Sequence, residues 1–454
     1  MKSNCGPGVA RPARLPLPRL PAKRAGVAEP TSPLAIPDFR RYWIARFAAV
    51  LATTAMVVVV AWQVYDVARS DYAMSVRDAA LLLGFVGLAQ FLPLALLTPL
   101  AGWVADRFER GLVARIAKCI DLLVAVALGI FTAADALTLP ILFAFAALHG
   151  VARVFIGPAM ASIAPNVVPP PLLPRAIAMS SIAWQSGSVA GPALGGLLYA
   201  ADAPLPYWFA VANLLIAIVA LTPIRKIVPP PLEAGRHPVR QMIDGLSYVR
   251  GHRFLLGAIT LDLFAVLVGG ATALLPVYAR DILHVGPEGL GVLRAAPAVG
   301  AAVVALWFSF RPLRHNVGVK MIGAVVAFGL ATIVFGLSQS LLLSLGALAA
   351  LGGFDMLSVY VRASLIQLHT PDAMRGRVSS VSTLAISSSN ELGEVQSGIA
   401  AALLGPVGAV VFGGVGAVAV ALGWAYLFPE LRRARTFDPP DTALPEAVMQ
   451  EKPA

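Results

Sequence analysis

A dense group of polar side chains interrupts an apolar stretch late in the chain. It contains Asn390, Glu391 and Glu394, and helical spacing puts the two glutamates on one face. Asp355 and Arg362 share a face of the preceding apolar stretch. Carboxyl groups in a medium of low dielectric constant can take up and release protons near neutral pH. These acids therefore predict proton coupling or substrate binding, and for each of them the alternative is pairing with Arg362 or a packing role.

Isolated charges also lie inside other apolar stretches. Asp121 and Arg153 are at similar depth, which predicts an ion pair between them with Lys118 one turn away; a purely structural ion pair is the alternative. Asp262 is a further candidate of the same kind. A charge at the centre of a membrane-spanning helix costs about 2.5–3.5 kcal/mol, so we expect these residues to have a function.

The elements that must position these residues are helices that cross a bilayer. The chain has 454 residues, of which 58% are hydrophobic and 13% charged, whereas soluble domains are about 45–50% apolar and 25% charged. A bilayer core about 30 Å thick requires roughly 20 apolar helical residues. We count about twelve such runs, the last two near Ser379–Leu404 and Val407–Phe428. The fold class predicted is an all-α membrane protein.

The loop charges predict the orientation. The net charge is +11, but the basic residues lie in short loops on one side and make no continuous face, which argues against a nucleic-acid partner. Positive loops stay in the cytoplasm, so both termini are expected there. Motifs for metal hydrolysis, nucleophilic catalysis and phosphate binding are absent from the sequence. We therefore expect no enzyme activity, no cofactor and no metal, and an ion or substrate gradient as the energy source.

Two motifs lie beside apolar runs. The first is Gly102-Trp-Val-Ala-Asp106-Arg107-Phe-Glu-Arg110, and the second places glycines at about four-residue spacing around a proline. Such spacing allows close helix packing, and proline favours a bend. The residues of the second motif are Gly187, Gly191, Pro192, Gly195 and Gly196.

Both motifs resemble signatures of the major facilitator superfamily, namely the loop after the second helix and the fifth-helix motif of proton-driven exporters. Arg153-Val-Phe-Ile-Gly157 resembles the intramembrane arginine motif of such exporters. The chain departs from the patterns at Glu109, at Ala178 and at Ile156. The resemblance implies that Asp106 and its neighbours stabilise one conformational state, and it favours export over import.

The resemblance also implies two six-helix transmembrane bundles of the major facilitator fold. The expected organisation is a disordered cytoplasmic tail over 1–38, a first bundle over 39–222, a cytoplasmic linker over 223–253, a second bundle over 254–429 and a tail over 430–454. The linker contains a basic amphipathic piece from His237 to Arg253, for which an inner-membrane-surface helix and a solvated loop are equal alternatives.

The chain further resembles the bacterial enterobactin-exporter-like branch, most clearly in Met374-Arg-Gly-Arg377-Val leading into the Glu391 region. We expect a proton-coupled exporter of a small amphipathic molecule (siderophore, metabolite or drug) in the bacterial inner membrane, a monomer whose partners are its substrate, protons and lipid. The alternatives are an importer or lipid flippase of the same fold, and a non-transporting sensor or a membrane-embedded enzyme.

Overall fold

The computed structural model describes residues 32–227, 238–311, 313 and 315–437. Most of the two predicted tails and part of the predicted linker lie outside these residues. Every regular element within them is helical. The first half contains η1 (Pro33–Ala35), α1 (Pro37–Ser70), α2 (Val76–Arg107), α3 (Arg110–Ala133), α4 (Leu139–Val167), η2 (Pro170–Leu172), α5 (Leu173–Ala201) and α6 (Leu205–Leu221).

The second half begins with a short helix outside the bundle and continues with long apolar helices. Its elements are α7 (Pro238–Gly251), α8 (Arg253–Gly269), η3 (Ala271–Leu274), α9 (Leu275–Val277), η4 (Tyr278–Ile282), α10 (Gly286–Phe310), α11 (Val317–Leu337), α12 (Leu341–His369), α13 (Asp372–Leu427) and α14 (Pro429–Arg433).

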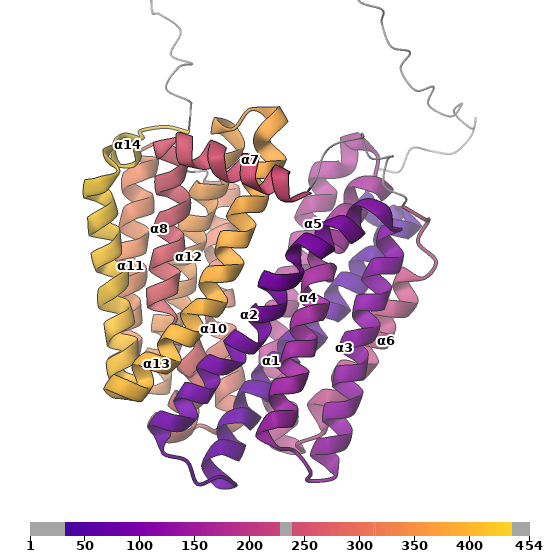
Figure 1. Ribbon diagram of the computed structural model, residues 1–454, viewed down its shortest axis with the longest axis vertical. Helices are drawn as coiled ribbons and strands as arrows, with labels where there is room; N and C mark the ends of the chain where they lie inside the picture. The colour runs from indigo at the N-terminus through magenta and orange to yellow at the C-terminus, as the bar shows by residue number, and fades with distance from the viewer. Residues whose placement is uncertain (1–31, 228–237, 312, 314, 438–454) are drawn as a thin grey trace, which may run out of the picture.

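Helices α1–α6 and α8–α13 form two bundles that lie side by side (Figure 1). The main contacts between the bundles are α2 with α13 and α5 with α10. Helices α7 and α14 lie at one end of the molecule, and the turn between α1 and α2 lies at the opposite end, called the far end below (Figure 1). Two bundles with separate helix–helix contacts are thus joined along two pairs of helices.

The hydrophobic core is shared at the far end and divided at the α7 end. One cluster of buried side chains includes Tyr65 and Leu83 of the first bundle together with Tyr278 and Leu290 of the second. Nearer α7, each bundle has a cluster of its own, one around Phe39 in α1 and α3–α6, the other in α8 and α11–α14. The bundles are therefore held together by apolar packing mainly at the far end.

Nine helices in the described part of the chain are long and apolar enough to cross a membrane. One of them, α13, has non-helical angles at Gly405 (φ 77°, ψ 164°), followed by Pro406. A positive φ favours glycine, so these residues divide α13 into two crossings, where the sequence predicts a boundary. With α13 counted twice and α5 and the shorter apolar α6 included, the helices are consistent with the predicted twelve spans.

The seventh span is interrupted. Helix α8 ends at Gly269, and the chain continues through η3, α9 and the π-helical η4 to Ile282. The carbonyl of Gly270 accepts a hydrogen bond of 2.8 Å from Oγ of Ser397, and that of Thr272 accepts one of 3.0 Å from Arg294. Non-helical backbone at membrane depth requires such partners. Side chains of α10 and α13 therefore stabilise the break.

The glycines of α5 permit close packing. A β-carbon at Gly195 would lie 2.8 Å from the carbonyl oxygen of Ala55 in α1, and one at Gly196 would lie 2.4 Å from that of Pro287 in α10. The first contact joins helices of one bundle, and the second joins the two bundles. The close packing predicted from the glycine spacing is thus present.

The amphipathic piece of the linker is a helix, α7, and it packs on the second bundle. Asp244 and Arg377 form an ion pair of 3.3 Å between α7 and α13. Val249 is buried, whereas Ile243 and Leu246 are exposed. Of the two alternatives drawn from the sequence, the solvated loop is wrong.

Candidate functional site

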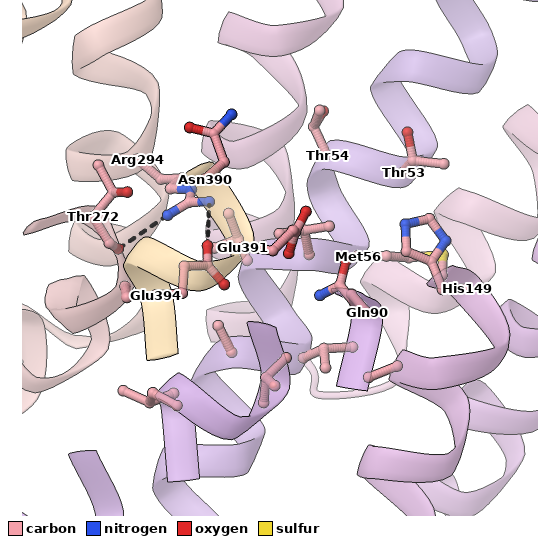
Figure 2. Close-up of a pocket in the computed structure, with 18 of the residues that line it drawn as sticks. Thr53, Thr54, Met56, Gln90, His149, Thr272, Arg294, Asn390, Glu391 and Glu394 are labelled. Carbon is pink, nitrogen blue, oxygen red and sulfur yellow. Dashed lines mark hydrogen bonds and ion pairs between the residues drawn. The ribbon is translucent and has the colours of Figure 1, made fainter. Parts of the chain in front are cut away.

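A central cavity of about 440 Å³ lies between the two bundles. Helices α1–α5 and α13 supply most of its walls, and the interrupted seventh span and α10 supply the rest. Most lining side chains are apolar, and a few polar groups converge on the space. The labelled residues of Figure 2 are Thr53, Thr54, Met56, Gln90, His149, Thr272, Arg294, Asn390, Glu391 and Glu394. Apolar walls with few polar groups are typical of sites for small molecules.

An ion pair crosses the cavity from one bundle to the other. Nη1 of Arg153 in α4 lies 2.7 Å from Oε1 of Glu391 in α13, and the same nitrogen donates to Oε1 of Gln90 at 3.0 Å. Glu391 is 8% exposed and Arg153 is 47% exposed. Hydrogen bonds between charged groups are roughly twice as strong as neutral ones. The charge of Glu391 therefore affects how firmly α4 is held to α13.

A second pair lies within the second bundle. Nη2 of Arg294 in α10 is 4.0 Å from Oε1 of Glu394, and Nη1 donates to the Thr272 carbonyl (Figure 2). Arg294 thus joins three elements: α10, α13 and the break in the seventh span. The predicted common face of Glu391 and Glu394 points into the cavity, and Asn390 also lines it.

The predicted pair between Asp121 and Arg153 is wrong. Oδ2 of Asp121 lies 3.0 Å from Nζ of Lys118, and Oδ1 lies 2.8 Å from Nδ1 of His149, while Arg153 reaches across to Glu391. The side chain of Asp121 is fully buried, and His149 lines the cavity. The predicted proximity of Lys118 is confirmed, and the imidazole of His149 takes the place assigned to the guanidinium.

Replacing Asp121 by leucine should destabilise the protein strongly. The change leaves the ammonium of Lys118, which is only 5% exposed, without its carboxylate, and breaking a buried pair in this way costs about 3–5 kcal/mol. We expect a lower thermal unfolding midpoint, measured by tryptophan fluorescence in detergent. The double variant Asp121→Leu/Lys118→Met should recover most of the loss. A single variant as stable as the wild type would contradict a structural role for the pair.

Asp262, Asp355 and Arg362 lie apart from the central cavity. Arg362 in α12 pairs with Asp262 in α8, and both are buried. Asp355 therefore does not take Arg362 as its partner, although the two share a helix face. Asp355 and Asp262 line a separate small cavity.

A further set of charges connects the bundles at the far end. Arg280 in η4 lies 2.5 Å from Oδ1 of Asp66 in α1, and Arg69 lies 3.7 Å from Asp281. The hydroxyl of Tyr65 donates to Asp281. We call Tyr65, Asp66, Arg69, Arg280 and Asp281 the far-end network. It joins the end of the first span to the end of the interrupted seventh span.

The sequence and the fold match those of known proteins. The family model described as transmembrane secretion effector, of the major facilitator superfamily, matches residues 28–451. The chain belongs to this family of major facilitator transporters. It is similar to the enterobactin exporter EntS of Citrobacter koseri, at 28% identity over 411 residues (90% of this chain and 96% of that protein).

Two further comparisons agree. The enterobactin exporter EntS of Escherichia coli O1:K1 is 26% identical over 410 residues, which cover 90% of this chain and 95% of that protein. A crystal structure of the peptide transporter POT superposes with a TM-score of 0.68 at 14% identity, over 88% of this chain and 95% of that chain. The first supports the enterobactin-exporter-like branch, and the second shows the fold. The chain is thus a multi-pass membrane transporter.

The loop motif of the transporter lies at the α7 end. The guanidinium of Arg107 stacks over the ring of Trp103 at 4.7 Å. The backbone N–H of Arg110 donates to the carbonyl of Ile227 at 3.2 Å. Gly102 is half-buried in α2, and the side chain of Asp106 lies outside what the structure describes. These contacts hold the loop to its own bundle.

The sequence patterns do not point to several polar residues of the transporter's cavity, namely His149, Arg294, Gln90, Thr53 and Thr54. Arg294 could have been found by the criterion that found Arg153, because it is an isolated charge inside an apolar run. The histidine gave no such signal, because it has no partner at a fixed spacing in its own helix.

Proposed function

We propose that this transporter is a proton-coupled exporter of a small amphipathic molecule: a siderophore, another metabolite or a drug. The observation that carries the proposal is the pairing of Arg153 with Glu391 across the bundles, inside a cavity of about 440 Å³. Cavities of about 300–1,000 Å³ with mainly apolar walls suit drug-sized ligands. The relatives named above are exporters, which supports the direction.

The mechanism that we propose is alternating access. With both termini in the cytoplasm, α7 lies on the cytoplasmic side and the far end faces the periplasm. The shared core and the far-end network hold the periplasmic side closed, so this conformation faces the cytoplasm. Substrate enters from that side and leaves after the bundles rock and the far end opens.

Glu391 and Glu394 are the proposed coupling acids. When Glu391 takes up a proton, its charge is lost and its bond to Arg153 becomes weaker. The hold of α4 on α13 then loosens, which links proton uptake to the movement of one bundle against the other. When Glu394 takes up a proton, its pairing with Arg294 becomes weaker in the same way. Arg294 also donates to the Thr272 carbonyl, so this change reaches the break in the seventh span.

The proposal predicts that substrate discharges a proton gradient. Everted membrane vesicles are acidified inside and followed with a pH-sensitive dye, and enterobactin or the cationic dye ethidium is added outside. We expect substrate-dependent loss of the gradient with the intact protein and none with Glu391→Gln/Glu394→Gln, because a glutamine cannot carry the proton.

Glu288→Gln is the matched control, since it removes an exposed carboxylate outside the cavity and should leave transport unchanged. If the double variant discharges the gradient as the wild type does, these acids do not couple transport. If substrate moves only together with protons, in the same direction, the chain is an importer.

A further inference from the structure

A second, very small cavity lies inside the second bundle. Residues of α8, α11 and α12 line it, among them Asp262, Asp355 and Ser358. Its volume is about 10 Å³, which is near the smallest that holds one water molecule. Val266 of α8 lines both this cavity and the central one. The two spaces therefore approach each other at Val266.

The charges around this cavity do not balance. Asp262 and Asp355 bring two carboxylates, and the nearby cation, Arg362, pairs with Asp262. The described lining from α11 consists of Val325 and Phe328, which carry no charge. The arginine of α10, Arg294, is engaged with Glu394 and Thr272. Among the described residues one negative charge thus remains, on the partly buried Asp355 inside a membrane-spanning helix, where a charge is costly.

The hydroxyl group of Ser358 indicates how the remaining negative charge is compensated. Oγ of Ser358 is buried, lines the cavity and has no hydrogen-bond partner among the residues that the structure describes. A helical serine usually donates to a carbonyl one turn earlier, as Ser364 does to Tyr360 at 2.8 Å in the same helix. Ser358 does not, although it lies three residues after Asp355 on the same face. Its oxygen is therefore left to accept a hydrogen bond from the cavity.

We propose that Asp355 and Ser358 form a proton-binding site, separate from the central cavity. Asp355 takes up one proton from water that passes Val266, and the protonated carboxyl donates to Oγ of Ser358. Asp262 remains ionised and paired with Arg362. A metal ion is a poor fit, since hard cations such as Ca²⁺ take six to eight oxygen ligands and only three of the described lining side chains carry oxygen. This site adds a proton that the proposed function does not use.

Infrared difference spectroscopy of the full-length protein in lipid tests the site without any substrate. The spectrum in neutral buffer minus that in alkaline buffer reports the C=O stretch of a protonated carboxyl group. We expect this band in Glu391→Gln/Glu394→Gln, in which the two proposed coupling acids cannot contribute to it, and its loss when Asp355→Asn is added to that variant. A band that persists in the triple variant Asp355→Asn/Glu391→Gln/Glu394→Gln overturns the proposal.

Ser358→Ala tests the placement of the proton, because it keeps the carboxyl group and removes only the acceptor. We expect the band to shift in this variant, and an unchanged band overturns the site even if Asp355→Asn fails to fold. Binding of radioactive sodium that protons displace, and that Asp355→Asn loses, would assign the site to a metal cation instead. The infrared band, its shift and the sodium binding are all measured without transport. Their results therefore test this site independently of the proposed exporter activity.

Discussion

Replacing Gly196 by valine should abolish transport while leaving the protein folded. A β-carbon at this position would lie 2.4 Å from the Pro287 carbonyl oxygen and 3.0 Å from the α-carbon of Gly291. Both obstacles are backbone atoms of α10, which cannot turn away as a side chain can. The valine should therefore prevent the approach of α5 to α10 that closes the far end. Transport is measured by the vesicle assay, and folding by size-exclusion chromatography.

The matched control is Gly346→Val, also in a membrane-spanning helix. Apart from its own turn of helix, a β-carbon at Gly346 would have no atom of the described residues within 4 Å, so this variant should transport as the wild type does. Both variants place a β-branched residue in a helix at the same cost. A loss of transport in Gly196→Val alone therefore cannot be due to this cost. Equal transport by the two variants would show that close contact between α5 and α10 is dispensable.

Reversing the charge of Arg280 should open the far end. Arg280→Asp replaces the attraction to Asp66 by repulsion and adds a negative charge beside Asp281. Partly exposed ion pairs contribute about 0.2–1 kcal/mol each, so we expect the open population to rise several-fold. The measurement is the reaction of a cysteine at Thr54, which lines the cavity, with a membrane-impermeant thiol reagent added from the periplasmic side of a protein without Cys5 and Cys119.

Two further variants make this experiment decisive. Asp66→Arg/Arg280→Asp restores an ion pair with its charges exchanged and should return the labelling rate toward that of the wild type. Arg253→Asp disrupts an exposed pair with Glu430 at the α7 end and should leave periplasmic labelling unchanged. If Arg280→Asp labels no faster than the wild type, the far-end network does not hold the two bundles together.

Much of the fold could be predicted because lipid imposes a simple rule on the sequence. A spanning helix must be mostly apolar over roughly 20 residues, so the runs are visible without any knowledge of the contacts between helices. The end of one apolar run near Gly405 is predicted in this way, although a single helix, α13, includes the residues on both sides of Gly405. The interruption of the seventh span was not found, because Gly269 and Gly270 are common residues in spanning helices and carry no local signal.

The candidate site was predicted in part. Glu391, Glu394 and Arg153 were each recognised as costly charges, and the structure brings all three to one cavity. Their partners were not predictable, since counting from the helix ends gives the depth of a residue and not the neighbour that its helix face meets. That is why Asp121 was assigned to Arg153, when the rotation of α3 and α4 turns it toward His149.

The interruption at Gly270 has a consequence for how occupancy of the cavity is transmitted. Arg294 is the donor that stabilises the freed Thr272 carbonyl, and it is also within reach of any solute in the cavity. We expect a solute with an acidic or carbonyl oxygen to compete for that guanidinium and so to weaken the anchor of the backbone after the break. The segment after the break carries Arg280 and Asp281, so we expect a solute bound at mid-membrane to weaken the distant far-end network as well.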